Sequence, residues 1–115
     1  MAEMGYCPSG RLFEAAACGV PLLSDVWEGL NEFFSIGSEI LVAHTTDDTM
    51  AALELPVQEL KKIAQAARER TLAEHTAERR AEQLELILND ALGPPASIKE
   101  PILEPRRKNT LSMEL

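Results

Sequence analysis

A serine, a glycine and an arginine in succession, with a glutamate one helical turn later, are the residues of this chain best suited to bind a ligand. Pro8 keeps the preceding chain extended and the Ser9 hydroxyl can cap a helix, so a helix is predicted to begin here. The first N–H groups of a helix have no helical partners and lie at the positive end of its dipole. Ser9, Gly10 and Arg11 therefore predict an anion site that suits a phosphate. Glu14 could accept hydrogen bonds from two hydroxyls of a ribose.

The same residues also allow a purely structural interpretation. Arg11 could pair with Glu14, or with another surface acid, as an ordinary ion pair along a helix. Ser9 could act as a helix cap and nothing more. The sequence leaves both interpretations open.

A short helix and a strand must position these residues. Glu14 falls outside the apolar face of the helix, and Gly19 suits the left-handed residue that ends it. The strand predicted at 20–24 is short and mostly apolar, as in parallel sheets covered on both faces. Asp25 follows at its carboxyl end, where open α/β sheets bind ligands. Helical spacing places four residues on the buried side of the helix: Leu12, Phe13, Ala16 and Ala17.

Further elements follow along the chain. Residues 27–34 have a helix-like apolar spacing, and Trp27 and Phe33 are expected to pack in the core rather than stack on a base. A second strand is predicted at 39–43. Asp47 is predicted to cap a short helix at 48–55.

Two longer helices are predicted next, followed by a disordered tail at 93–115. The first, at 57–73, is amphipathic, and its inward face is Val57, Leu60, Ile63, Ala64, Ala67 and Thr71. The second, at 77–92, is capped by Thr76. Its residues predicted to point inward are Ala77, Ala81, Leu84, Leu88 and Ala91. His75 lies at the junction of the two helices, where an imidazolium would suit the carbonyl end of the first.

A longer pattern surrounds the ligand-binding candidates: Pro8-Ser9-x-Arg11-Leu12-Phe13-Glu14-Ala15-x-Ala17-Cys18-Gly19-x-Pro21. It resembles the nucleotide-sugar-binding segment of two-domain GT-B glycosyltransferases, and within them it is closest to the CgeB/spore-maturation-type group. The resemblance covers roughly residues 5 to 90 and continues through Asp25, Trp27-Glu28-Gly29-Leu30, Phe33-Phe34, Gly37, Glu39-Ile40-Leu41 and His75-Thr76-x-x-x-Arg80.

This resemblance implies a C-terminal Rossmann-like domain that holds a nucleoside-diphosphate sugar, with the acceptor on a separate N-terminal domain. It implies that Ser9, Gly10 and Arg11 bind the donor diphosphate and that Glu14 binds the ribose. Secondary contacts are expected from Tyr6, Asp25 and Glu28. The broader retaining group has a second glutamate eight residues before the one matched by Glu14, and this chain has Tyr6 there. The phosphate or hexose contact of that glutamate is therefore not carried over.

The expected fold class is α/β: a partial Rossmann-like C-terminal half of a GT-B donor domain, helix-rich with two short parallel strands. It is expected to span residues 1–92. With two strands instead of five or six, its apolar sheet edges would be unpaired, which favours association with a missing N-terminal part or self-association.

Composition and charge exclude several classes of ligand and partner. The formal net charge of −8 argues against duplex nucleic acid as a ligand. Cys7 and Cys18 fit no zinc or redox spacing, and His44 and His75 have no metal ligands at a suitable spacing, so neither a metal nor another cofactor is expected. No signal peptide or membrane span is predicted, and a cytoplasmic location is expected.

The function expected from these observations is donor binding within a nucleotide-sugar-dependent glycosyltransferase. No catalytic residue is assigned. Without an acceptor domain, this chain alone is not expected to catalyse transfer. The alternative is a non-catalytic truncated domain that acts as an interaction module and needs a partner or self-association.

Overall fold

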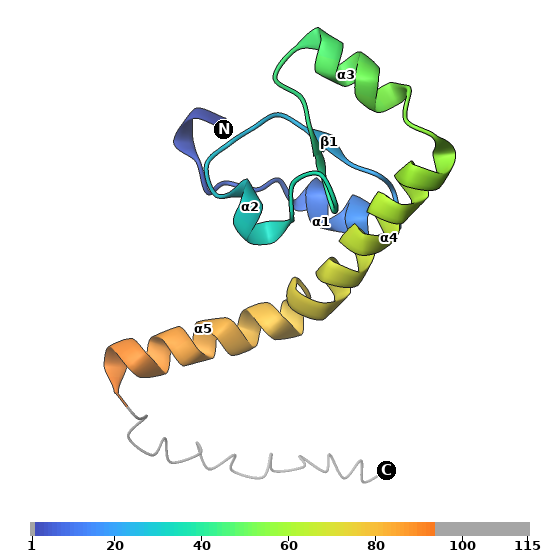
Figure 1. Ribbon diagram of the computed structural model, residues 1–115. Coiled ribbons are helices and arrows are strands. Elements are labelled where there is room, and N and C mark those ends of the chain that lie inside the picture. Colours follow the sequence, from blue (N-terminus) through green and yellow to red (C-terminus); the bar gives the residue numbers. More distant parts are fainter. Residues whose placement is uncertain (1, 94–115) are drawn as a thin grey trace, which may run out of the picture.

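The computed structural model describes residues 2–93 and shows a helix-rich α/β fold (Figure 1). The predicted helix-rich α/β class with two short parallel strands is confirmed, and residues 2–93 contain five α-helices. The predicted tail lies outside the described residues, apart from Gly93. The elements in chain order are η1 (Ala2–Met4), α1 (Gly10–Ala17), β1 (Leu23–Ser24), α2 (Leu30–Phe33), β2 (Leu41–Val42), α3 (Thr46–Leu53), α4 (Val57–Glu74) and α5 (Ala77–Leu92).

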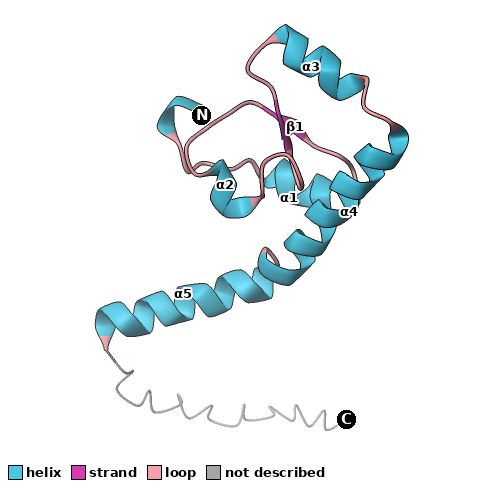
Figure 2. Ribbon diagram, viewed as in Figure 1, coloured by secondary structure: helices cyan, strands magenta, loops and turns pink. Residues whose placement is uncertain are grey.

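The sheet consists of one parallel pair, β1 beside β2 (Figure 2). Leu23 pairs with Leu41 and Ser24 pairs with Val42. Both strands are shorter than the ranges predicted from the sequence. Pro21 lacks an N–H for the ladder, and among the described residues no third strand lies beside the pair to extend it.

The core lies where α1, α2, β2 and α4 meet. Phe34 is the largest of its fully buried side chains, and the others in this cluster are Ala16, Leu30, Ile40 and Ala67. Trp27 and Phe33 pack against the cluster, which confirms that they are packing residues.

Helices α1 and α4 make the most extensive contact between any two of the described elements. Ala16 on α1 and Ala67 on α4 are both completely buried, and small side chains let two helices approach closely. The Arg68 Nε of α4 donates a hydrogen bond to the Ala17 carbonyl at the end of α1, at 3.1 Å. Helix α4 therefore fixes both the face and the end of α1.

Helix α3 begins earlier than predicted. Its cap is Thr45, not Asp47, and Thr45 forms a capping box with Asp48. The Asp48 carboxylate accepts the backbone N–H groups of His44 at 2.8 Å and Thr45 at 3.1 Å. These bonds, that from His44 foremost, hold the pKa of Asp48 below its usual value. The helix begins at Thr45 rather than at Asp47 because the reciprocal capping box satisfies two otherwise unpaired N–H groups at once.

The inward face of α4 is mostly as predicted. Ile63, Ala64, Ala67 and Thr71 are buried. Val57 is an exception, since its side chain is 65% exposed at the first turn of the helix. The first turn of α4 therefore extends beyond the core.

Helix α5 differs most from the expectation. Thr76 caps it as predicted, accepting the Arg79 N–H at 3.3 Å. The residues predicted to point inward are all exposed, because α5 turns away after α4 and no other described element packs along it (Figure 1). They are Ala77, Ala81, Leu84, Leu88 and Ala91.

Candidate functional site at the start of α1

The start of α1 is built as the sequence predicts. Ser9 has an extended backbone, and its hydroxyl accepts the Arg11 N–H at 3.4 Å. This bond is long and therefore weak. Within residues 2–93 the Gly10 N–H has no hydrogen-bond partner, and apart from its chain neighbours and the nearby helix backbone no atom lies within 4 Å of where a side chain on Gly10 would begin. The helix start is open, with an unpaired amide at its positive end.

Arg11 and Glu14 both lie exposed on α1. Neither forms an ion pair with another described residue; the ion pairs between described residues join Arg70 to Glu39, Arg70 to Glu74 and Arg79 to Glu82. The structure therefore does not pair Arg11 with Glu14 as a structural ion pair. Both charged groups are available to a ligand, one helical turn apart.

The N-terminal segment folds back on the turn before α2. The Tyr6 N–H donates to the Glu28 carbonyl at 2.7 Å, so the structure brings these two predicted contacts together. Tyr6 has a φ of 48°, and its ring lies against Gly29, where a Cβ would come within 2.5 Å of it. The negative charges of Glu32 and then Glu28 raise the pKa of the Tyr6 phenol above its usual value.

Asp25 lies at the carboxyl end of β1, as predicted, and is exposed. Its backbone carbonyl and its Oδ1 accept the Ser24 hydroxyl at 2.9 Å and 3.3 Å. No hydrogen bond within residues 2–93 joins Asp25 to Arg11 or Glu14. Its role in ligand binding stays a prediction.

Neither thiol is in a disulfide: Cys7 and Cys18 are free and exposed. Among residues 2–93, no group of three or more His, Cys, Asp or Glu side chains is placed to hold a metal ion. In the same part of the chain, every helix is too short or too polar to cross a bilayer.

Comparison with known proteins identifies the family. A sequence model of the family described as glycosyl transferase-like matches residues 1–85, which is 85 of the 115 residues. The chain belongs to the glycosyl transferase-like family. Searches of curated proteins and of solved structures found no match. The part of this glycosyl transferase-like chain that matches includes all of α1 to α4 and the first half of α5.

A histidine junction holds these elements together in a way that the sequence analysis did not foresee. The His75 Nε2 lies 2.7 Å from the Phe33 carbonyl, and the Arg80 Nη2 lies 2.7 Å from the His75 Nδ1. Because guanidinium only donates, Nδ1 must accept, and Nε2 carries the proton that bonds Phe33. Phe13 and Phe34 complete the contact, with ring centroids 5.1 and 5.5 Å from that of His75.

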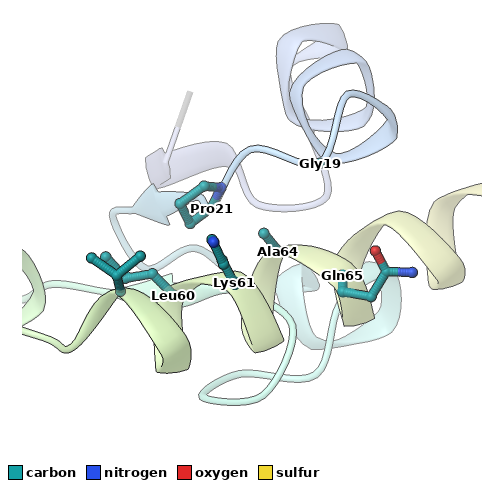
Figure 3. Close-up of a pocket in the computed structure, with 7 residues that line it drawn as sticks. Gly19, Pro21, Leu60, Lys61, Ala64 and Gln65 are labelled. Atoms are coloured by element: carbon teal, nitrogen blue, oxygen red, sulfur yellow. The ribbon is translucent and has the colours of Figure 1, made fainter.

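An apolar hollow in this glycosyl transferase-like fold also lies outside the sequence predictions. It measures about 560 Å³ and lies between the loop after α1 and the first half of α4 (Figure 3). A smaller one of about 150 Å³ adjoins it and shares Pro21 and Leu60. Ser9, Gly10, Arg11 and Glu14 line neither. The larger hollow, here called the Pro21 hollow, is lined by Gly19, Pro21, Val57, Leu60, Lys61, Ala64 and Gln65.

Proposed function

We propose that this chain binds the donor of a glycosyltransferase, a nucleoside-diphosphate sugar, at the start of α1. The observation that carries the proposal is the open, capped helix start, which lies within the residues that match the glycosyl transferase-like family. Its unpaired Gly10 amide and exposed Arg11 and Glu14 supply the groups that such a donor requires.

The proposed binding mode divides the donor between three kinds of group. The diphosphate rests on the amides of Ser9, Gly10 and Arg11, where the helix dipole favours negative charge. The Arg11 guanidinium offsets the charge that develops on the diphosphate as it leaves the sugar. Glu14 accepts hydrogen bonds from the ribose hydroxyls. Tyr6, Glu28 and Asp25 are proposed secondary contacts.

Within the family, we propose membership of the CgeB/spore-maturation-type group, which rests on the pattern from Pro8 to Pro21. The proposed activity belongs to an enzyme that also has an acceptor surface, and this chain supplies the donor side of it. No metal takes part in the proposed binding, since amides and a guanidinium provide the positive charge. The exposed, free thiols suit a reducing compartment, so we place the protein in the cytoplasm.

Calorimetric titration of the chain with UDP, GDP and dTDP, and with the matching nucleosides, tests this proposal. Arg11→Ala should weaken a nucleoside diphosphate by about 10-fold or more and the nucleoside little, since a charge-assisted bond contributes roughly 1.5–3 kcal/mol. Glu14→Ala should weaken both ligands alike, because ribose is common to them.

Lys62→Ala and Glu59→Ala are matched controls, since each removes one exposed charge from α4 and should leave both affinities unchanged. Equal losses in Arg11→Ala and Glu14→Ala for every ligand would contradict the assigned roles. Absence of binding by the unmodified chain at millimolar nucleotide would contradict donor binding by this polypeptide.

A further inference from the structure

Helix α5 carries an apolar surface that nothing in the described chain covers. Leu84, Ile87, Leu88 and Ala91 recur at the spacing of one helix face and are here called the α5 stripe. The three larger side chains are 57%, 64% and 46% exposed. Exposed leucines scattered singly are ordinary, but a continuous stripe on one helix marks an interaction surface.

A second apolar surface lies at the other end of α4. The Pro21 hollow opens beside the first half of that helix, and Figure 3 shows Lys61 extending from α4 toward Pro21. Val57, on its lining, is largely exposed, and so is the neighbouring Leu53. A groove with an apolar floor suits an amphipathic helix whose anchors are spaced by three and four residues.

The charged side chains that flank the stripe and the one on the lining of the hollow have opposite signs, although Glu59 also lies near Lys61. Glu85 and Asp90 flank the α5 stripe, one on each side of it by helical geometry. Lys61 lies on the lining of the hollow and Lys62 is next to it. Within residues 2–93 none of these four side chains forms an ion pair. An apolar helix face flanked by acids therefore suits an apolar hollow with Lys61 on its lining.

The stripe does not reach the hollow of its own chain in this fold. His75 and Arg80 fix the turn between α4 and α5 through their contacts with the Phe33 carbonyl and with each other. Helix α5 consequently points away from the first half of α4 (Figure 1). Among residues 2–93, the α5 stripe can therefore meet this hollow only in another copy of the chain.

We propose that the α5 stripe of one copy of this chain docks in the Pro21 hollow of a second copy. The hollow and the stripe lie at opposite ends of the arm formed by α4 and α5, on either side of the His75 junction. A two-fold axis near that junction brings each stripe onto the other copy's hollow, so the contact closes as a dimer. Lys61 then faces Glu85 of the other copy. This interface is separate from the proposed donor site and does not depend on it.

Sedimentation equilibrium of the full chain tests the proposal. The unmodified chain should dimerise. Leu84→Glu with Leu88→Glu should raise the dimer dissociation constant on the order of 100-fold or more, because two charges would be buried in the hollow. Leu86→Glu is the matched control, since Leu86 is 69% exposed on the opposite side of α5 and should leave the dimer unchanged. Far-ultraviolet circular dichroism should be the same for all three.

A charge exchange distinguishes docking in the hollow from simple pairing of two α5 helices. Lys61→Glu alone and Glu85→Lys alone should each weaken the dimer by about 10-fold, and the double variant should restore it. A monomeric unmodified chain at high concentration would overturn the proposal. So would a dimer that depends on Leu84 and Leu88 but is indifferent to Lys61, because that result means that α5 binds another α5.

Discussion

Phe34→Ala is expected to remove a large share of the stability of this fold. Phe34 is completely buried at the centre of the core, and its ring centroid lies 5.8 Å from that of Phe13 and 5.5 Å from that of His75. Truncation of a buried phenylalanine to alanine costs about 3–5 kcal/mol. At roughly 0.05–0.15 kcal/mol per residue, 92 described residues give a total stability of about 5–14 kcal/mol. We expect a loss of about 4 kcal/mol.

Urea unfolding followed by fluorescence measures this loss. The single tryptophan, Trp27, packs on the core with its ring 6.0 Å from that of Phe33, so its emission reports the core and not the exposed α5. Each variant should be measured at one fixed protein concentration, because self-association would add to the apparent stability. Phe34→Leu, which keeps most of the volume, should cost less than half as much as Phe34→Ala.

Leu86→Ala serves as the control, because this leucine is exposed on α5 and its truncation should change the free energy of unfolding by less than about 0.5 kcal/mol. If Phe34→Ala cost no more than Leu86→Ala, Phe34 would not lie in a closely packed core. That result would refute the assignment of the core to the meeting of α1, α2, β2 and α4.

Two further predictions concern the segment around Tyr6. Gly29→Ala should destabilise the fold more than Gly37→Ala in urea unfolding: both glycines have φ near +90°, but only at Gly29 would the new Cβ meet the Tyr6 ring, at 2.5 Å. An alanine at a positive φ costs about 1–2 kcal/mol at either position. Overpacking against the Tyr6 ring adds about 1–3 kcal/mol at Gly29. Equal losses in the two variants would mean that the ring does not lie against Gly29. Glu32→Gln should lower the pKa of Tyr6, the single tyrosine, in an ultraviolet absorbance titration, and Glu28→Gln should lower it less, because removing a carboxylate charge favours the phenolate. Glu59→Gln should have no effect, and a pKa that is unchanged in Glu32→Gln would contradict the docking of this segment.

Local signals in the sequence predicted the elements around the candidate site well. The Ser9 cap, the left-handed Gly19 and the exposed position of Glu14 all follow from rules that act within a few residues. The apolar run at 20–24 predicted a strand of a parallel sheet, and β1 does pair in parallel with β2. Where the choice was between neighbouring caps, Thr45 replaced Asp47 because only Thr45 can form the box with Asp48.

Features that depend on distant parts of the chain were not predicted. Helical spacing shows that α5 has an apolar side, but it does not show what covers that side, and in the described chain nothing does. The His75 junction joins Phe33 to Arg80, and the Pro21 hollow joins the loop after α1 to α4. Such contacts follow from the tertiary arrangement, which single-residue patterns do not encode. Donor binding at Ser9, Gly10, Arg11 and Glu14 stays a prediction.

The hydrogen bond from Arg68 to the Ala17 carbonyl makes the position of α1 depend on α4. It spans 51 positions and ties the far end of α1 to a helix that bears none of the proposed donor contacts. Loss of that guanidinium, or a larger side chain at Ala67, would tilt the whole of α1 and carry Gly10 and Glu14 with it. Natural variation in α4 could thus alter nucleotide affinity without touching the proposed donor site, because α1 moves as one rigid helix.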